Sequence, residues 1–283
     1  MLLDGPSTSM QLSGALLVVT STNAVTNLGS VLTIDTVTGV TRTIASGRSL
    51  PINPTIGMKD AYWMEWEPSA ADGQFRPIVK APLDEPGDVS TVLRTNGSGY
   101  QMLGLGTLYF QNGLDEIDSL QPGAASATPL VTGSSALFFA ADDQYLYWTD
   151  CSRSEVARVP FGGGQPQHLA DGSCPYSIGL LGFDLLYMNA GEPGVHRIPA
   201  AGGPGTVIGT SNIVSNTNLA VSPGWTTDEQ AAYFGAAEGL YRVMLSTGEI
   251  ARLATGLVYD VAVDASCVYW TDSDAAAVFM LPK

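Results

Sequence analysis

The sequence is poor in basic residues. Its 283 residues hold 12 Lys and Arg against 27 Asp and Glu, a formal net charge of −15, and the lysines are limited to Lys59, Lys80 and Lys283. A surface this acidic repels phosphate backbones and anionic lipids, which argues against nucleic acid and anionic membranes as partners. Cationic and neutral ligands stay open, and so does an acidic surface that only keeps the protein soluble.

Histidine is almost absent, and so are familiar catalytic motifs. The two histidines, His168 in PQHLADG and His196 in GVHRIPA, are expected to be surface or packing residues. No HExxH, GxSxG or P-loop motif occurs, and the glycines at 162–164 fit a hairpin turn better than a phosphate site. We therefore predict no catalytic residue, no metal site and no cofactor. Scattered carboxylates could hold Ca²⁺, but no DxDxDG loop supports such a site.

Long apolar runs are missing too. No run approaches 18 residues, so no transmembrane helix is predicted, and the start MLLDGPSTSM lacks the basic and apolar blocks of a signal peptide. The protein is therefore expected either to be cytosolic or to have lost a presequence. No long pattern with a 3.6-residue period occurs, whereas 32 glycines and 17 prolines interrupt the chain. This composition favours many short strands joined by tight turns.

What the sequence does contain is a repeat. The hexad YLYWTD at 145–150 returns as CVYWTD at 267–272, so Tyr147 and Tyr269 lie 269 − 147 = 122 positions apart. That spacing is about three times 40 residues, a period typical of repeat architectures. Around both hexads a cycle of four short β-branched or aromatic segments recurs, each followed by Gly, Asp, Asn or Pro, as in an antiparallel meander.

The cycle predicts an all-β fold, a seven-bladed β-propeller of four-stranded antiparallel blades in one domain; six blades is the alternative. The predicted blades cover 7–48, 53–95, 99–133, 135–172, 176–211, 216–256 and 258–283, and in the sixth NTNLAVS is the expected inner strand. The last cycle lacks one strand. Because HLADGSCPYSIGLLG resembles MLLDGPSTSMQLSG at the start, Met1–Leu3 is expected to supply that strand beside Ala277–Pro282 and close the ring.

The tetrads at 147–150 and 269–272 resemble those of the YWTD β-propellers of low-density-lipoprotein-receptor ectodomains and of bacterial secreted YWTD-like proteins. The resemblance implies the architecture but not the partners, since the receptor propellers have six blades and other tetrads here decay to YWME, YFQN, YMNA and YFGA. Strand side chains alternate, so Tyr147 and Thr149 should face one neighbouring blade, and Trp148 and Asp150 the other. The aspartate is expected to accept hydrogen bonds from turn backbone.

The sequence contains three cysteines. Cys151 and Cys174 fall in neighbouring loops that emerge on the same propeller face, which predicts a disulfide between them. A disulfide implies an oxidising compartment, so the protein is expected to be secreted or periplasmic with its signal peptide removed. Cys267 has no partner and is predicted to be a buried free thiol.

The same face should carry the mouth of the central channel. Candidate ligand-binding residues lie at the starts of inner strands and the ends of second strands: Tyr100, Gln101, Tyr176, Ser177, Asn218, Tyr259, Asp260, Glu65, Asn112, Asp150 and Asp272. Tyrosines among carboxylates suit sugars by stacking or cations by charge and cation–π contact. The alternative is an ordinary propeller mouth that tyrosines plug.

Two classes of function follow. The first is a recognition module outside the cytoplasm that binds a protein, glycan or cationic ligand on the loop-rich face. The second is a propeller lyase or hydrolase, in which Glu65 or Asp260 would serve as the base. A purely architectural role is a third option, because a propeller fold hosts binding modules and enzymes alike.

Overall fold

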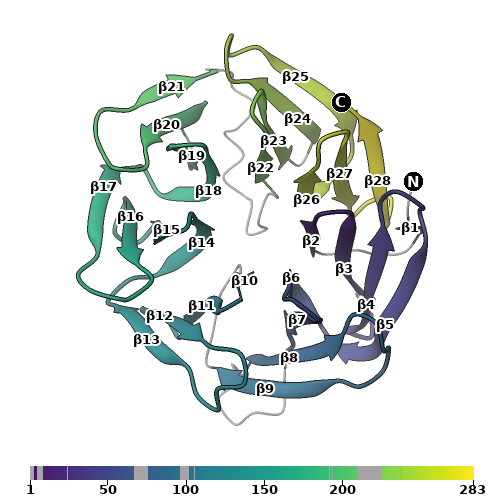
Figure 1. The fold of residues 1–283 in the computed structure, drawn as a ribbon. Coiled ribbons are helices and arrows are strands. Elements are labelled where there is room, and N and C mark those ends of the chain that lie inside the picture. Colours follow the sequence, from purple (N-terminus) through teal and green to yellow (C-terminus); the bar gives the residue numbers. More distant parts are fainter. Residues whose placement is uncertain are drawn as a thin grey trace.

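The chain forms a ring of seven four-stranded antiparallel sheets around a central axis (Figure 1). In this computed structural model the described residues are 3–4, 9–23, 25–66, 76–95, 102–104, 106–190, 192, 194–209, 225–236 and 238–283. Each sheet is one blade; in blades 1 to 6 the strands follow chain order from the axis outwards, and in blade 7 the outermost strand is the N-terminal one. The seven-bladed propeller predicted from the repeat is confirmed. No helix long and apolar enough to cross a membrane occurs within these ranges.

The strands of the seven blades have the following bounds. Blades 1 and 2 consist of β2 Ser9–Ser13, β3 Leu16–Thr22, β4 Leu28–Asp35 and β5 Thr41–Ser49, then β6 Ile52–Ile56, β7 Asp60–Met64, β8 Arg76–Pro82 and β9 Ser90–Thr95. Blades 3 and 4 consist of β10 Met102–Gly104, β11 Leu108–Asn112, β12 Glu116–Leu120 and β13 Thr128–Thr132, then β14 Ala136–Ala141, β15 Tyr145–Asp150, β16 Glu155–Pro160 and β17 Gln167–Asp171.

The remaining blades repeat this order. Blades 5 and 6 consist of β18 Pro175–Leu181, β19 Asp184–Asn189, β20 Val195–Pro199 and β21 Thr206–Ile208, then β22 Trp225–Thr227, β23 Ala231–Ala236, β24 Gly239–Met244 and β25 Ile250–Thr255. Blade 7 consists of β26 Val258–Val263, β27 Cys267–Asp272, β28 Ala277–Pro282 and β1 Leu3–Asp4.

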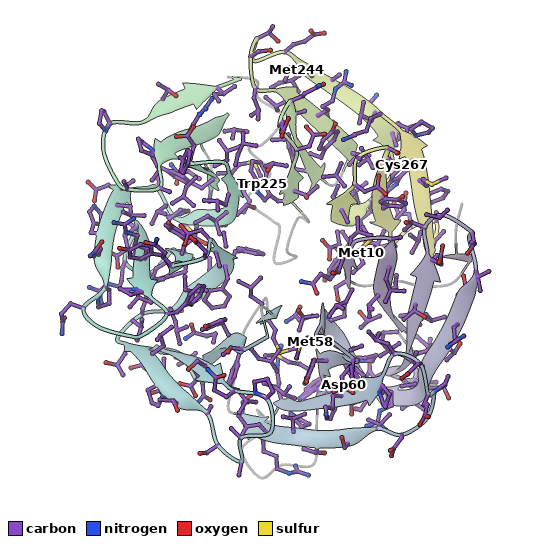
Figure 2. All side chains as sticks on the ribbon, in the orientation of Figure 1. Met10, Met58, Asp60, Trp225, Met244 and Cys267 are labelled. Atoms are coloured by element: carbon purple, nitrogen blue, oxygen red, sulfur yellow. A yellow bond between two sulfur atoms is a disulfide. The ribbon has the colours of Figure 1, made fainter. Side chains whose placement is uncertain are left out.

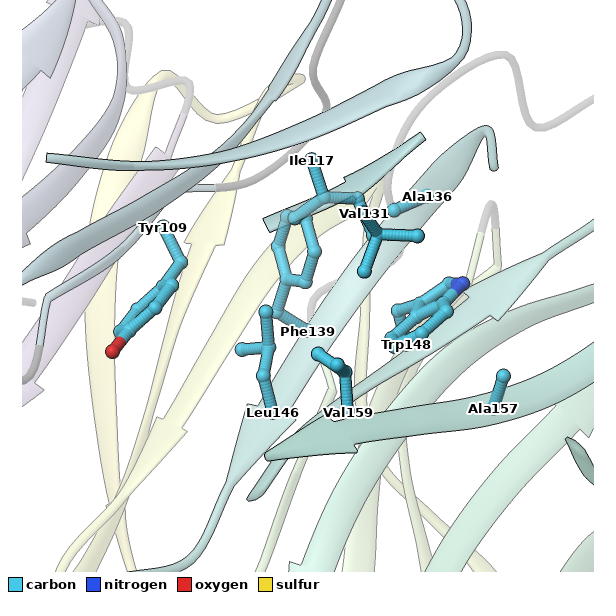
Figure 3. Close-up of a cluster of buried hydrophobic side chains, with 9 residues drawn as sticks. All are labelled: Tyr109, Ile117, Val131, Ala136, Phe139, Leu146, Trp148, Ala157 and Val159. Carbon is cyan, nitrogen blue, oxygen red and sulfur yellow. The ribbon is translucent and has the colours of Figure 1, made fainter. Parts of the chain in front are cut away.

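The second strand of each blade is buried on both faces, as the alternation of the hexad predicts. Trp148 on β15 packs into a cluster shared with Tyr109 and Val131 of blade 3 (Figure 3). Its neighbour Tyr147 packs on the other side, against Ile178 and Tyr187 of blade 5. The second hexad is arranged alike, because Trp270 joins a cluster with blade 6 and Tyr269 one with blade 1. The hexad therefore spans the two interfaces on either side of its blade.

In blades 4, 6 and 7 an aspartate accepts hydrogen bonds from the backbone of the turn that precedes the second strand. In blade 4 one Asp142 oxygen accepts the Gln144 and Tyr145 N–H groups at 2.7 Å each, and the other accepts the Tyr147 hydroxyl at 2.6 Å. Asp264 in blade 7 and Asp228 in blade 6 likewise accept the N–H groups two and three residues later, together with the hydroxyl of Tyr269 or Tyr233. This Asp, five residues before the Tyr, is a repeat signal that the sequence analysis missed.

The missed signal explains one wrong prediction. The inner strand of blade 6 was expected at 216–222, which lies outside the described residues, whereas the strand that pairs with β23 is β22, Trp225–Thr227. The turn aspartate fixes this choice, because TTDEQAAYF at 226–234 has the same spacing as AADDQYLYW at 140–148. An inner strand must therefore end directly before Asp228.

The two ends of the chain close the ring. In β1, Leu3 pairs with Val278 and Asp4 with Ala277, so the N-terminal segment is the outer strand of blade 7 beside β28. Within the predicted segment 1–3 the closure is confirmed for Leu3, and the strand extends to Asp4, which was not predicted; residues 1 and 2 lie outside the described residues. Closure of this kind leaves β28 with a partner on both edges.

Deleting residues 1–6 should lower the melting temperature, because β28 would lose its outer partner. Loss of a few ladder hydrogen bonds should reduce the free energy of unfolding by about 1–3 kcal/mol, measured by urea denaturation. A control that lacks only residues 1 and 2 keeps the β1–β28 pair and should unfold like the parent. Equal stability of all three proteins would show that β1 contributes nothing to closure.

Candidate functional site

One face of the propeller carries the disulfide, and we call it the disulfide face. It consists of the loops between second and third strands and the segments that lead from each outer strand to the next inner strand. Cys151 follows β15 and Cys174 precedes β18, and the two are bonded, which confirms the predicted pair. The bond ties blade 4 to blade 5. Cys267 is free as predicted, but it is only partly buried because it begins β27 beside a hairpin turn.

Two predicted mouth residues hold loops of this face together. Asp150 is fully buried; one of its oxygens accepts Ser134 Oγ and Ser135 N–H, and the other accepts Ser152 Oγ and Arg153 N–H. Asp272 occupies the same place in blade 7 and accepts the N–H groups of the residues two and three positions later. The expected turn role of this aspartate is confirmed.

In blades 2 and 3 the position of this aspartate is held by Glu65 and Asn112, which also form side-chain hydrogen bonds. Glu65 is buried and accepts Arg48 Nε at 2.6 Å, Arg48 Nη2 at 2.9 Å and Trp63 Nε1 at 2.7 Å. Asn112 donates from Nδ2 to Asp118 Oδ2 at 2.8 Å. The second-strand ends of these blades therefore position loops and fix neighbouring side chains.

The inner strand of blade 7 carries a carboxyl group whose pKa is raised. Asp260 on β26 accepts the Met10 N–H of blade 1 at 2.8 Å and the Val261 N–H at 2.9 Å. Burial nevertheless raises the pKa of Asp260 to about 7, against the lowering effect of these two hydrogen bonds. The carboxyl therefore links blades 7 and 1 while it titrates near neutral pH.

The predicted tyrosines differ in burial. Tyr176 packs with Trp225 into the cluster between blades 5 and 6, and burial raises its pKa to about 12. Burial also raises the pKa of Tyr259, and the neighbouring Asp260 adds to the shift. Ser177 is buried. Tyr100, Gln101 and Asn218 lie outside the described residues. The described part of the predicted mouth thus brings together only Tyr259 and Asp260, on one blade.

Neither histidine lies on an inner strand of the propeller: His168 is on the fourth strand of blade 4 and His196 on the third strand of blade 5. His168 lies on an outer strand, half-exposed, with Nδ1 3.2 Å from Glu155. His196 stacks on Tyr187 with ring centroids 5.0 Å apart, and burial lowers its pKa. Among the described residues, no group of three or more His, Cys, Asp or Glu side chains converges as a metal site would require.

Apolar side chains on this face were not singled out from the sequence. Val25, Leu28, Trp66 and Leu114, which we call the apolar rim, are exposed by 92%, 50%, 38% and 74%. They lie at the loops between second and third strands of blades 1, 2 and 3. Leu28 pairs with Ser49, and Ser49 exchanges hydrogen bonds with Trp66, so the blade 1 and blade 2 parts are joined. An apolar residue inside a turn, as in NLG and GLD, was the available signal.

Comparison with known proteins adds the fold alone. No protein-family model and no curated protein sequence matches the chain. Similar solved structures include a streptogramin B lyase (15% identity, 98% of this chain and 93% of that one, TM-score 0.72) and the hydrazine synthase of Kuenenia stuttgartiensis (13%, 99% and 96%, 0.71). A chain of a nidogen/laminin complex is 15% identical over 74% of this chain and 87% of its own, with a TM-score of 0.57. These proteins include binding modules and enzymes, so the function is not determined by the likeness.

Replacing Asp150 with Ala should destabilise the fold, because four donors around a fully buried carboxylate would lose their acceptor. We expect the free energy of unfolding to fall by about 3 kcal/mol or more, measured by chemical denaturation. The matched control is Asp171→Ala, which removes a carboxylate whose side chain is 99% exposed and should change stability by less than about 0.5 kcal/mol. Similar small effects of both variants would contradict the structural role of Asp150.

Asp260 should make stability depend on pH. Because its pKa is raised to about 7 in the folded state, its stabilising contribution is complete below about 3.8 and is lost as the pH rises through about 7. Relative to Asp260→Asn, which does not titrate, the parent should lose on the order of 3 kcal/mol between pH 4 and pH 8. Denaturation of both proteins across this range gives the difference. A constant difference would mean that Asp260 stays ionised throughout.

Proposed function

We propose that this chain is a YWTD-type propeller that acts outside the cytoplasm as a recognition module and binds a protein partner over the apolar rim of the disulfide face. The observation that carries the proposal is the rim itself, four exposed apolar side chains on the loops of three successive blades. Exposed apolar side chains that gather on one face are typical of interaction sites, and tryptophan is enriched among the residues that dominate binding energy.

Several described residues of this face are held by covalent or polar contacts. The disulfide and the backbone bonds to Asp150 and Asp272 hold turns of blades 4, 5 and 7, and Glu65 binds the Arg48 side chain beside the blade 2 part of the rim. The disulfide further supports a location in an oxidising compartment. A propeller of similar fold comes from a nidogen/laminin complex, a protein–protein assembly.

Catalysis has weaker support from the same geometry. The pKa of Asp260 suits a general base, but both of its oxygens already accept backbone N–H groups. Glu65, the other candidate base, is held by Arg48 and Trp63. Both carboxylates are therefore engaged in structural hydrogen bonds.

The test is capture of a partner from the extracellular fraction of the source cells, followed by titration calorimetry with that purified partner. Trp66→Ala should raise Kd by at least about tenfold, and the more exposed Leu114→Asp should do so without affecting folding. Phe183→Ala, which removes a 93% exposed ring at the β18–β19 turn on the opposite face, should leave Kd unchanged. A partner equally bound by all three variants, or binding only to arrayed glycans, would refute the proposal.

A further inference from the structure

A cavity of about 420 Å³ opens on the face opposite the disulfide, at the junction of blades 2 and 3. Its walls come from the β6–β7 turn and β9 of blade 2, and from the β10–β11 and β12–β13 turns of blade 3. Figure 2 labels Met58 and Asp60 on the blade 2 side of this junction. The volume lies in the range of small-molecule sites. It does not involve the apolar rim, so the inference is independent of the proposed function.

The body of the cavity is apolar. Its walls include the ring of one tyrosine and five aliphatic side chains: Tyr62, Val92, Leu108, Leu120, Pro122 and Ala124. The backbone at Gly57 allows the tyrosine ring to lie there, because a Cβ at position 57 would come within 2.7 Å of the Tyr62 ring. An apolar or aromatic group can therefore fill the cavity and exclude water from these walls.

The edge of the cavity is positively charged, which is unusual for this chain. Two of its three lysines, Lys59 and Lys80, line the cavity, while Asp60 is the only acidic residue among the lining residues that the structure describes. Lys80 Nζ lies 2.8 Å from Asp60 Oδ2 and 6.0 Å from the centre of the Tyr62 ring. Lys59 is exposed and forms no ion pair with any residue that the structure describes. The lining therefore carries two positive charges and one negative charge in a protein of net charge −15.

We propose that this cavity binds a small amphipathic monoanion, an organic acid whose apolar or aromatic body enters between blades 2 and 3 while its acidic group contacts Lys59. One negative charge matches the net charge of +1 in the lining. A cation would meet two lysines, and a large polyanion would be repelled by the acidic remainder of the surface. The hydroxyl of Thr91 and the amide of Gln121 line the same cavity and can donate hydrogen bonds to the acid.

The test uses anilinonaphthalene sulfonate, a fluorescent aromatic monoanion, and N-phenyl-naphthylamine, its close analogue without the charge. The folded parent protein should bind the anion at one site, more tightly than the neutral analogue, and less tightly as salt concentration rises. Lys59→Gln should weaken anion binding by about threefold or more and leave the neutral analogue unaffected. The matched control is Lys283→Gln, because the third lysine pairs with Asp228 on the far side of the ring.

Two further variants separate charge from shape. Ala124→Trp places a large ring at the cavity wall and should weaken both probes, whereas Lys80→Gln also removes the partner of Asp60 and is interpreted only if its melting temperature is unchanged. The proposal is supported when Lys59→Gln and Ala124→Trp weaken binding and Lys283→Gln does not. It is overturned if the parent binds no anion, if the neutral analogue binds as tightly, or if Lys59→Gln and Lys283→Gln behave alike.

Discussion

The structure depends on one constraint, that the second strand of each blade is buried on both of its faces. In β15, for example, Tyr147 completes one interface and Trp148 the next, so a single strand takes part in two packing clusters. Seven such strands join the blades into a ring, and the pairing of β1 with β28 leaves no open end. Most side chains of these strands are used in packing, and those that stay accessible, such as Asp60 and Tyr62, lie at a junction between blades. Binding and catalysis are therefore confined to loops, to the inner wall and to the junctions between blades.

Part of the acidic composition follows from this architecture. Burial opposes ionisation of Asp142, but the hydrogen bonds from Tyr147 and from two backbone N–H groups outweigh it and lower its pKa. The pKa of Asp264 is lowered for the same reasons. These aspartates stabilise the fold above the pKa of the unfolded chain, and their contribution is lost on acidification through the folded pKa. Asp260 acts in the opposite direction, because its raised pKa makes its contribution to stability largest in acid.

The fold could be predicted from the repeat because the repeated residues are those that pack between neighbouring blades. The positions of Tyr147 and Tyr269 set the period, and strand alternation then placed their neighbours on the correct blades. The inner strand of blade 6 was misplaced because its position depends on a turn aspartate, Asp228, and that signal was not used. The position of this strand is set by a hydrogen-bonded turn, so the repeat period of hydrophobic residues alone did not locate it.

The candidate sites were less predictable, for a different physical reason. Whether Glu65 points at a ligand or at Arg48 depends on which side chains the neighbouring loop brings near, and spacing along one blade carries no such information. The cavity is a stronger case, because Lys59, Lys80 and Gln121 belong to two blades and meet only when those blades pack together. A repeat describes what successive blades share. Specific recognition must come from what they do not share, and in this chain those departures are the apolar turns of blades 1 to 3 and the two lysines of blade 2.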